Sequence, residues 1–276
     1  MTTHADSEPV VLVRVDAGVM LITLNRPERN NGWTIEMEES YFDALAAAAN
    51  DADVRVIVVT GAGRAFCPGL DINVLSAATD GTRMADRPRR PMNFPLSIPK
   101  PIIAAINGAC AGIGFIQASC ADLRFAAAGA KLTTSFARRG LPAENSLSWI
   151  LPRIVGTANA MDLLLSGRVV LAEEAKKLGF VNRVVEPDEL LPVTMAYAHD
   201  LAANCSPRAM ATIKRQVLDD WEASLDQSRR RALELVVALE ESGSDFKEGV
   251  ASFREKRPPN FQGLAVVVDD NREWAR

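Results

Sequence analysis

Two glycine-bearing loops hold the backbone groups of this chain that are best placed to do chemistry. They run over Gly61–Asp71 (GAGRAFCPGLD) and Asn107–Gly114 (NGACAGIG), and each follows an apolar run typical of a buried strand, Val54–Thr60 and Pro101–Ile106. Each loop leads into a helix-like segment, and the first N–H groups of a helix favour negative charge. Brought together, two such groups can hold one oxygen and stabilise charge on a carbonyl. Two ordinary strand-to-helix turns would have the same spacing.

Nucleotide-binding loops do not explain these glycines. The dinucleotide fingerprint needs a third glycine at position 66 in the first loop or at position 117 in the second, and these positions hold Phe66 and Gln117. The sequence also has no Gly-x-x-x-x-Gly-Lys-Ser/Thr phosphate loop.

Composition indicates a globular protein that does not bind nucleic acid. The 276 residues are 48% hydrophobic and 24% charged, and the net charge is −4. A sequence pI near 5.4 argues against an electrostatic footprint for nucleic acid. The one basic cluster, 83–90, is either a solvated loop or a contact for an anionic ligand. No apolar run reaches the ~18 residues of a membrane span, so we expect no membrane partner.

Four cysteines and two histidines do not form a metal-binding pattern. Cys67, Cys110, Cys120 and Cys205 have no paired spacing, so we expect no metal site and interpret these residues as free thiols, mostly buried. Residues 1–9 lack the pattern of a signal peptide. Together these features predict a cytoplasmic protein.

The chain begins with a strand–strand–helix–strand pattern. Val10–Val15 and Val19–Leu24 are β-branched runs separated by a turn, a helix is predicted over Thr34–Asn50, and Val54–Thr60 follows as a strand. The same reasoning predicts strands at Pro101–Ile106, Leu123–Ala126, Lys131–Thr134 and Val181–Val185, and helices at Val74–Ala78, Gly112–Ala121, Leu147–Ile154, Ala158–Ser166 and Leu171–Leu178.

The pattern changes after about residue 190. Four helices are predicted in succession, at Leu191–Ala203, Pro207–Glu222, Ser224–Glu241 and Asp245–Lys256. An all-helical end of this kind either packs on a partner subunit or caps the core.

Six stretches, which are distributed over most of the chain and include both glycine loops, resemble the crotonase superfamily, the enoyl-CoA hydratase/isomerase family. The resemblance implies an α/β fold, a crotonase-like spiral of ββα repeats with a C-terminal α-helical trimerisation region. It implies a core over 1–190 with a site for coenzyme A thioesters, and helices over 191–276 that assemble a homotrimer or a dimer of trimers. The thioester is the substrate, and no further cofactor is implied. The matching stretches are Thr23–Pro27 (TLNRP), Val54–Ile72, Pro99–Arg124, Ser148–Gly156, Gly167–Val185 and Phe246–Gly263.

The resemblance places an oxyanion hole in the two glycine loops. Its donors would be the backbone N–H groups of Leu70 and Ile113, and Gly69 and Gly112 would allow the close approach. Asp71 would accept hydrogen bonds from the next turn and fix the first loop.

The resemblance also assigns substrate contacts. Coenzyme A would lie near Arg29, Ala65, Pro68 and Ile72. Further cations for its phosphates would come from Arg64 and from Lys256 or Arg257 of a neighbouring subunit, with Lys100 and Lys214 as weaker candidates. The acyl chain would contact Val74, Leu75, Phe94, Ile113, Phe115, Phe136 and Leu141.

One carboxylate is placed for acid–base chemistry. Hydratases of this family use two carboxylates, which would fall at Ile116 and Phe136, and a hydrocarbon side chain cannot activate water. Glu144 falls where the related Δ3,Δ2-enoyl-CoA isomerases carry a single catalytic glutamate. The sequence therefore predicts double-bond isomerisation of an enoyl-CoA.

Other functions remain open at this stage. Glu144 is also a favourable residue near the start of a helix. The alternatives are an enoyl-CoA hydratase by family label, an acyl-CoA-binding protein that has lost catalysis, and hydrolase or lyase chemistry. Relatives with hydrolase chemistry often use histidine, and neither His4 nor His199 lies near the loops in sequence.

Overall fold

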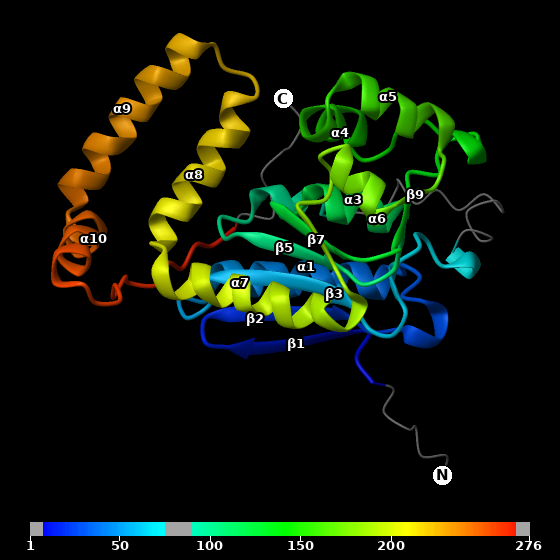
Figure 1. Cartoon of the computed structure of the whole chain (residues 1–276), viewed down its shortest axis with the longest axis horizontal. Helices are drawn as coiled ribbons and strands as arrows, with labels where there is room; N and C mark the ends of the chain where they lie inside the picture. The colour runs from blue at the N-terminus through cyan, green and yellow to red at the C-terminus, as the bar shows by residue number, and fades with distance from the viewer. Residues whose placement is uncertain (1–7, 75–89, 269–276) are drawn as a thin grey trace.

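The strands form two adjoining sheets. The computed structural model describes residues 8–74 and 90–268 (Figure 1). Six strands make the larger sheet in the order β1 (Val11–Asp16), β2 (Val19–Leu24), β3 (Val56–Gly61), β5 (Ile102–Ile106), β7 (Leu123–Ala127) and β10 (Arg183–Val185). Four short strands make the smaller one in the order β4 (Ala65–Cys67), β6 (Ala109–Ala111), β8 (Lys131–Thr133) and β9 (Val170–Leu171).

Successive repeats supply one strand to each sheet. β3, β5 and β7 are parallel neighbours in the larger sheet, and β4, β6 and β8, which follow them in the chain, are parallel neighbours in the smaller sheet. Each repeat is therefore displaced by one strand position from the previous one. This arrangement is the predicted spiral of ββα units, and it places the loops after β4 and β6 next to each other.

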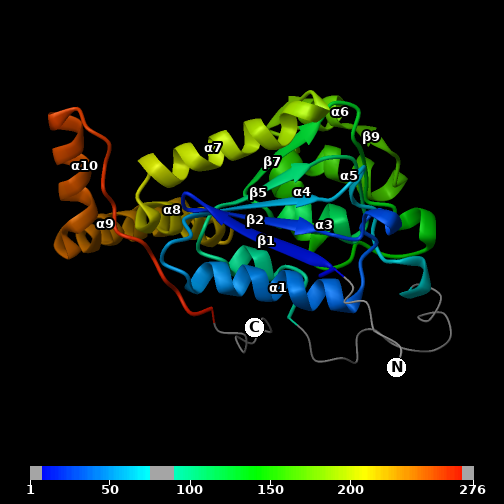
Figure 2. The same cartoon turned by 90° about the horizontal axis from the view of Figure 1, so that it is seen from below.

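Two helices cover opposite faces of the larger sheet. Figure 2 shows α1 (Ile35–Asn50) on one face and α7 (Leu190–Asn204) on the other. The strands alternate accordingly: Ile57 and Val59 belong to the cluster that contains α1, whereas Val56 and Val58 pack with α7. The other helices of the core are α3 (Ile113–Cys120), α4 (Leu147–Val155), α5 (Thr157–Ser166) and α6 (Ala172–Lys177).

The C-terminal helices extend to one side of the core. α9 (Leu225–Ser242) and α10 (Ser244–Glu255) stand away from the sheets at the left of Figure 1. α8 (Pro207–Asp220) lies between them and the core, where Met210 packs with the α7 cluster and Lys214 pairs with Asp122. The division expected at residue 190 coincides with the start of α7 and stays a prediction. No helix in the described part of the chain combines the length and apolar character needed to cross a membrane.

The predicted elements agree with the structure within a few residues, and the fold class is confirmed. β4, β6 and β9 were missed, because β4 and β6 lie inside the stretches interpreted as glycine loops and the two residues of β9 directly precede α6. The helix expected at 74–78 and the basic cluster at 83–90 lie almost wholly outside the described residues.

Candidate functional site

The two glycine loops lie against each other. β4 pairs in parallel with β6, so that Cys67 is opposite Cys110. Just beyond this pair, a Cβ added to Gly112 would lie 3.6 Å from the Cα of Gly69, and one added to Gly69 would lie 3.3 Å from the carbonyl oxygen of Ala111. Gly69 and Gly112 also have φ of 109° and 50°, a backbone that side chains disfavour, so glycine suits both positions.

Leu70 presents its N–H away from its nearest strand partner. The N–H of Trp33 donates to the oxygen of Gly69 at 2.8 Å, and the N–H of Asp71 donates to the oxygen of Trp33 at 2.9 Å. In a parallel bridge these bonds use the residues on either side of Leu70, whose own N–H therefore points the other way. Among the described residues it has no recorded acceptor.

Ile113 is the first residue of α3 and has no helical acceptor for its N–H. Within residues 8–74 and 90–268 no other acceptor is recorded for it. The first turn of α3 packs directly on β4, because a Cβ at Gly114 would come within 2.1 Å of the carbonyl oxygen of Cys67. The described region therefore holds two N–H donors, on adjoining loops, that are available to bind an oxygen.

Asp71 fixes the first loop, as the sequence predicted. Its carboxylate is 6% exposed and accepts from the N–H of Asn73 at 3.0 Å and from Arg26 Nη1 at 3.0 Å. The hydrogen bond from Asn73 lowers the pKa of Asp71 most, and Arg26 adds to this effect. Arg26 also donates to the oxygen of Gly32 at 2.6 Å. Sequence reasoning missed this arginine, although it lies within the TLNRP stretch.

Two asparagines tie down the start of the same loop. Asn31 is fully buried and donates to the oxygens of Ala62 and Ala65 at 2.9 and 2.7 Å. Asn107 donates to Gly63 and Ala65 from the opposite loop at 2.9 and 3.2 Å. These bonds satisfy carbonyls that the turn leaves unpaired, so the loop has a fixed shape before any ligand arrives.

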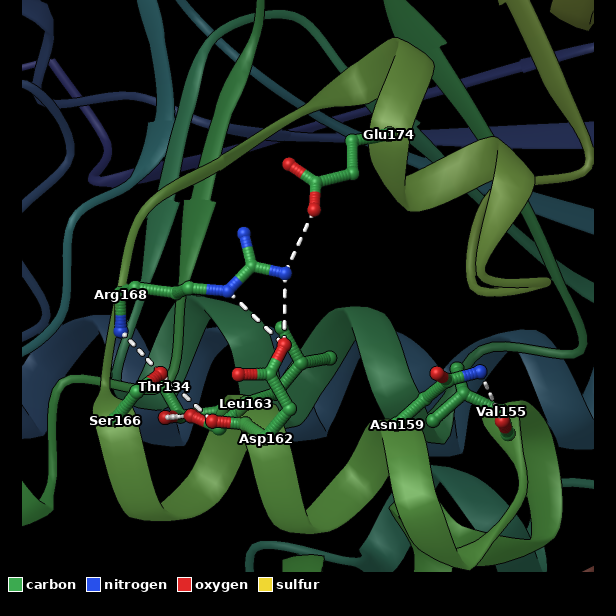
Figure 3. Close-up of polar contacts among 8 residues, drawn as sticks. All are labelled: Thr134, Val155, Asn159, Asp162, Leu163, Ser166, Arg168 and Glu174. Atoms are coloured by element: carbon green, nitrogen blue, oxygen red, sulfur yellow. Dashed lines mark hydrogen bonds and ion pairs between the residues drawn. The ribbon is translucent and has the colours of Figure 1, made fainter.

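A third segment, 133–146, carries Phe136, Leu141 and Glu144. The oxygen of Thr133 accepts from the N–H of Gly112 at 3.3 Å, which joins this segment to the second glycine loop. Buried Thr134 donates to the oxygen of Leu163 in α5 at 2.8 Å (Figure 3).

The end of α5 is fixed to α6 by a surface ion-pair network. Figure 3 shows Arg168 reaching Asp162 of α5 at 2.7 Å and Glu174 of α6 at 2.6 Å. Arg138 of the third segment donates to the oxygen of Ser166 at 2.8 Å. The start of the third segment, just after β8, is therefore hydrogen-bonded to the C-terminal part of α5.

Glu144 is half-buried and lies three residues before α4. Its carbonyl oxygen accepts from the N–H of Leu147 at 3.0 Å, and α4 packs against α3. Asn145 and Ser146 follow with φ of 51° and 62°. This left-handed backbone is unfavourable for side chains other than glycine, and it fixes the sharp turn after the acid.

The positions of the two hydratase carboxylates are buried hydrocarbon. Ile116 is 0% exposed and Phe136 is 5% exposed, and both belong to the main hydrophobic core. Neither side chain can hold a water molecule for attack.

Several predicted coenzyme A contacts line one polar pocket of ≈ 390 Å³. Ala65 and Pro68 are among its walls, and Arg64 and Lys131 bring positive charge; Lys131 was not foreseen. Arg29 is exposed, and Ile72 is 69% exposed. The other lining residues are Asn30, Gly108, Ala109, Gly129 and Ala130.

Some weaker expectations are corrected. Lys100 is 2% exposed and donates to the backbone oxygens of Ala48 and Asp51, so it is not available to a phosphate. Lys214 is ion-paired with Asp122 at 2.8 Å. Within one chain, Arg257 pairs with Glu248 and Glu255, both at 2.6 Å, and Lys256 is exposed; their contact with a neighbouring subunit's ligand stays a prediction.

Four of the expected acyl-chain contacts, Phe94, Ile113, Phe115 and Phe136, belong to the hydrophobic core. Phe115 stacks on Phe180, with ring centroids 4.5 Å apart, and Phe94 packs edge-on against Phe42. Apolar character alone does not separate a pocket wall from the core, which explains the error. Leu75 lies outside the described residues.

All four cysteines are free, and Cys67, Cys110 and Cys120 are buried. In the described parts of the chain, no cluster of His, Cys, Asp and Glu side chains has the composition to bind a metal ion.

The chain is similar to known proteins over most of its length. A family model described as Enoyl-CoA hydratase/isomerase matches residues 14–264. The 1,2-epoxyphenylacetyl-CoA isomerase of Escherichia coli (strain K12) is 34% identical over 259 residues, covering 92% of this chain and 98% of that protein. The (E)-benzylidenesuccinyl-CoA hydratase of Thauera aromatica is 34% identical over 257 residues, covering 92% and 99%. The structure of an enoyl-CoA hydratase from Mycobacterium tuberculosis H37Rv matches with a TM-score of 0.85 at 31% identity, covering 93% of this chain and 100% of that one.

Gly114→Ala is expected to separate the two loops. Its Cβ would overlap the backbone of Cys67, which no side-chain movement can relieve. We expect the free energy of unfolding to fall by about 3 kcal/mol in denaturant titrations. Gly249→Ala is the matched control, because its Cβ would make only ordinary contacts with Phe261 and should be neutral or slightly stabilising. Equal stability of the two variants would contradict the close approach.

Asp71→Asn is expected to destabilise the protein in a pH-dependent manner. The folded pKa of Asp71 lies below its usual value of 3.8, so its carboxylate stabilises the fold above that pH, and this contribution is lost as the pH falls through the lower folded pKa. Loss of the charged hydrogen bonds should cost about 1.5–3 kcal/mol at neutral pH. The difference from wild type should shrink below about pH 4. Asp53→Asn is the control, because Asp53 is exposed. If the free energy of unfolding of Asp71→Asn differs from that of wild type by the same amount at every pH, the stabilising role of the Asp71 carboxylate is refuted.

Proposed function

Since this chain belongs to the enoyl-CoA hydratase/isomerase family and is one of its acyl-CoA enzymes, we propose that it moves the double bond of an enoyl-CoA from the 3,4 to the 2,3 position. One observation carries the proposal. The N–H groups of Leu70 and Ile113, for which no acceptor is recorded among the described residues, lie on loops in mutual contact, and Glu144 lies on the segment attached to the second loop.

The two amides would stabilise an enolate. Removing a proton from C2 of a thioester leaves negative charge on the thioester oxygen. Donors already aimed at that oxygen need no reorganisation during the reaction, and losing one typically costs ~2.7–4 kcal/mol of barrier. Because Asp71, Asn31 and Asn107 fix the first loop, its donor is held in place before substrate binds.

Glu144 would move the proton. Its carboxylate takes the proton from C2, and the C–H electron pair passes into a dienolate whose charge rests on the thioester oxygen. The carboxylic acid so formed returns the proton to C4, the electrons shift back, and the double bond lies between C2 and C3. One carboxylate suffices, and no water is consumed.

Buried hydrocarbon at Ile116 and Phe136 favours isomerisation over hydration, because hydration needs two groups to hold and activate water. The same two residues motivate the second candidate, an acyl-CoA-binding protein without catalysis.

Coenzyme A would occupy the polar pocket beside the first glycine loop. Arg64 and Lys131 supply positive charge there for its phosphates, and Ala65 and Pro68 bring the backbone close to the ligand. Arg29 and Ile72 would lie along the path from this pocket to Leu70.

We also propose that α8–α10 assemble a trimer or a dimer of trimers. Large apolar side chains on these helices face solvent in the single chain, among them Phe253 at 86%, Leu233 at 63% and Phe246 at 59% exposed. Phe246 and Phe253 line an apolar groove of ≈ 760 Å³ between α8, α9 and α10, together with Val236. Exposed apolar patches of this extent mark interaction sites.

The decisive assay follows the absorbance of the conjugated thioester. With 3-enoyl-CoA, wild type should generate the signal, and Glu144→Gln should lower kcat at least about 100-fold, because the amide cannot accept the proton. KM should change little. Asp53→Asn is the control, because it also replaces a carboxylate by its amide, at an exposed position, and it should leave kcat unchanged.

Other outcomes separate the alternatives. Loss of conjugated absorbance from 2-enoyl-CoA that survives Glu144→Gln would contradict the assignment and favour hydration. Binding of both thioesters with no turnover would favour the non-catalytic protein.

Assembly is tested by sedimentation velocity. Wild type should sediment as a trimer or hexamer, and Val236→Glu combined with Phe246→Glu should yield monomer, because charge would be buried in an apolar contact. Lys247→Glu, exposed on α10, should leave assembly unchanged. A monomeric wild-type protein would disprove this proposal.

A further inference from the structure

Arg124 is a buried cation whose recorded hydrogen-bond acceptors, among the described residues, are backbone oxygens. It lies in β7 and is 6% exposed, and no ion pair with another described residue is recorded for it. Burial lowers the pKa of its guanidinium to about 10, with nearby Asp122 acting in the opposite direction, so the group stays charged at neutral pH. A buried charge is costly unless polar partners surround it.

The partners of Arg124 are backbone carbonyls, and two of them belong to the end of α3. Nη1 donates to Ala121 at 2.5 Å and to Ala118 at 3.3 Å, and Nε donates to Phe180 at 2.6 Å. The last carbonyls of a helix lack partners within it and favour a cation. Arg124 therefore satisfies the C-terminal end of the helix whose first residue is Ile113.

A ring contact holds the same helix from the side. Phe115 of α3 stacks on Phe180 with 8° between the planes, and the Arg124 guanidinium lies 5.2 Å from the centre of the Phe180 ring. Phe180 itself is anchored to α6, since its N–H donates to Ala175 at 2.9 Å. Asn182 bonds both backbone groups of Arg124 at 2.8 Å.

We propose that Arg124 is a positioning residue that sets where α3 lies and thereby aims the N–H of Ile113. The inference rests on the proposed oxyanion role of that amide. α3 has eight residues, or about 12 Å of helix, so it moves as a rigid rod and its two ends are coupled.

The choice of arginine supports a role in orientation. Loss of the guanidinium would leave the carbonyl oxygens of Ala118, Ala121 and Phe180 without this donor, so Arg124 contributes to stability as well as to orientation. The planar guanidinium presents donors in a fixed fork, which defines the direction of each carbonyl that it binds. A lysine at this position would keep the charge but lose the fork and most of the ring contact.

The test compares Arg124→Met with Arg55→Met. Arg55 also donates to two backbone carbonyls, of Ala202 and Phe261 at 2.9 and 2.7 Å, but on the α7 side of the sheet, away from α3. Both variants should lower Tm. Only Arg124→Met should lower kcat, by 10- to 100-fold as expected for a displaced catalytic donor, with KM within twofold. The kcat of Arg124→Lys should lie between those of Arg124→Met and wild type. Arg124→Lys replaces Arg124→Met in the comparison if Arg124→Met does not fold.

A second readout does not depend on turnover. The infrared stretch of a ¹³C-labelled thioester carbonyl in bound hexanoyl-CoA reports hydrogen bonds to that oxygen. It should be lowered in wild type and in Arg55→Met, and should return toward its value in water in Arg124→Met. If wild type shows no lowering, the proposed oxyanion hole itself is wrong. If the carbonyl frequency is lowered in wild type, and Arg124→Met keeps both this lowered frequency and the wild-type kcat, Arg124 has no positioning role.

Discussion

The site depends on close contact between the backbones of two loops, which belong to successive repeats. β4 and β6 pair in parallel, and the chain continues past them without side chains at Gly69, Gly112 and Gly114. Only glycine permits this separation, since a Cβ at Gly114 would overlap a carbonyl oxygen of the neighbouring strand. Everything proposed for the site follows from this contact, because it brings two amides from segments more than 40 residues apart in sequence to one place.

Buried polar groups hold the contact in shape. Asn31, Asn107 and the Asp71–Arg26 pair satisfy the first loop, and Arg124 satisfies the far end of α3. Each is costly to bury alone and stabilising when fully bonded, so each favours a single arrangement of its neighbours. If the loops instead became ordered only when substrate binds, part of the binding free energy would be spent on ordering them.

A site made of main-chain donors can keep its position while its side chains change. Leu70 and Ile113 contribute N–H groups that any residue but proline would supply, whereas the acid–base group must be a particular side chain. Under the proposed function, hydrocarbon at Ile116 and Phe136 and a carboxylate at Glu144 would alter the reaction without altering the scaffold. This separation would explain how the chain resembles both a named isomerase and a named hydratase at the same 34% identity.

The sequence by itself determined the larger elements and the two glycine loops, because buried strands and amphipathic helices have a period that side chains reveal. It also identified Asp71 as the residue that fixes the first loop. Tertiary structure alone decided that Ala65–Cys67 and Ala109–Ala111 are strands, since three residues acquire strand geometry only by pairing with another repeat. It decided likewise that Phe115 and Lys100 are core residues and that Arg26 and Arg124 face inward, because burial depends on neighbours distant in sequence.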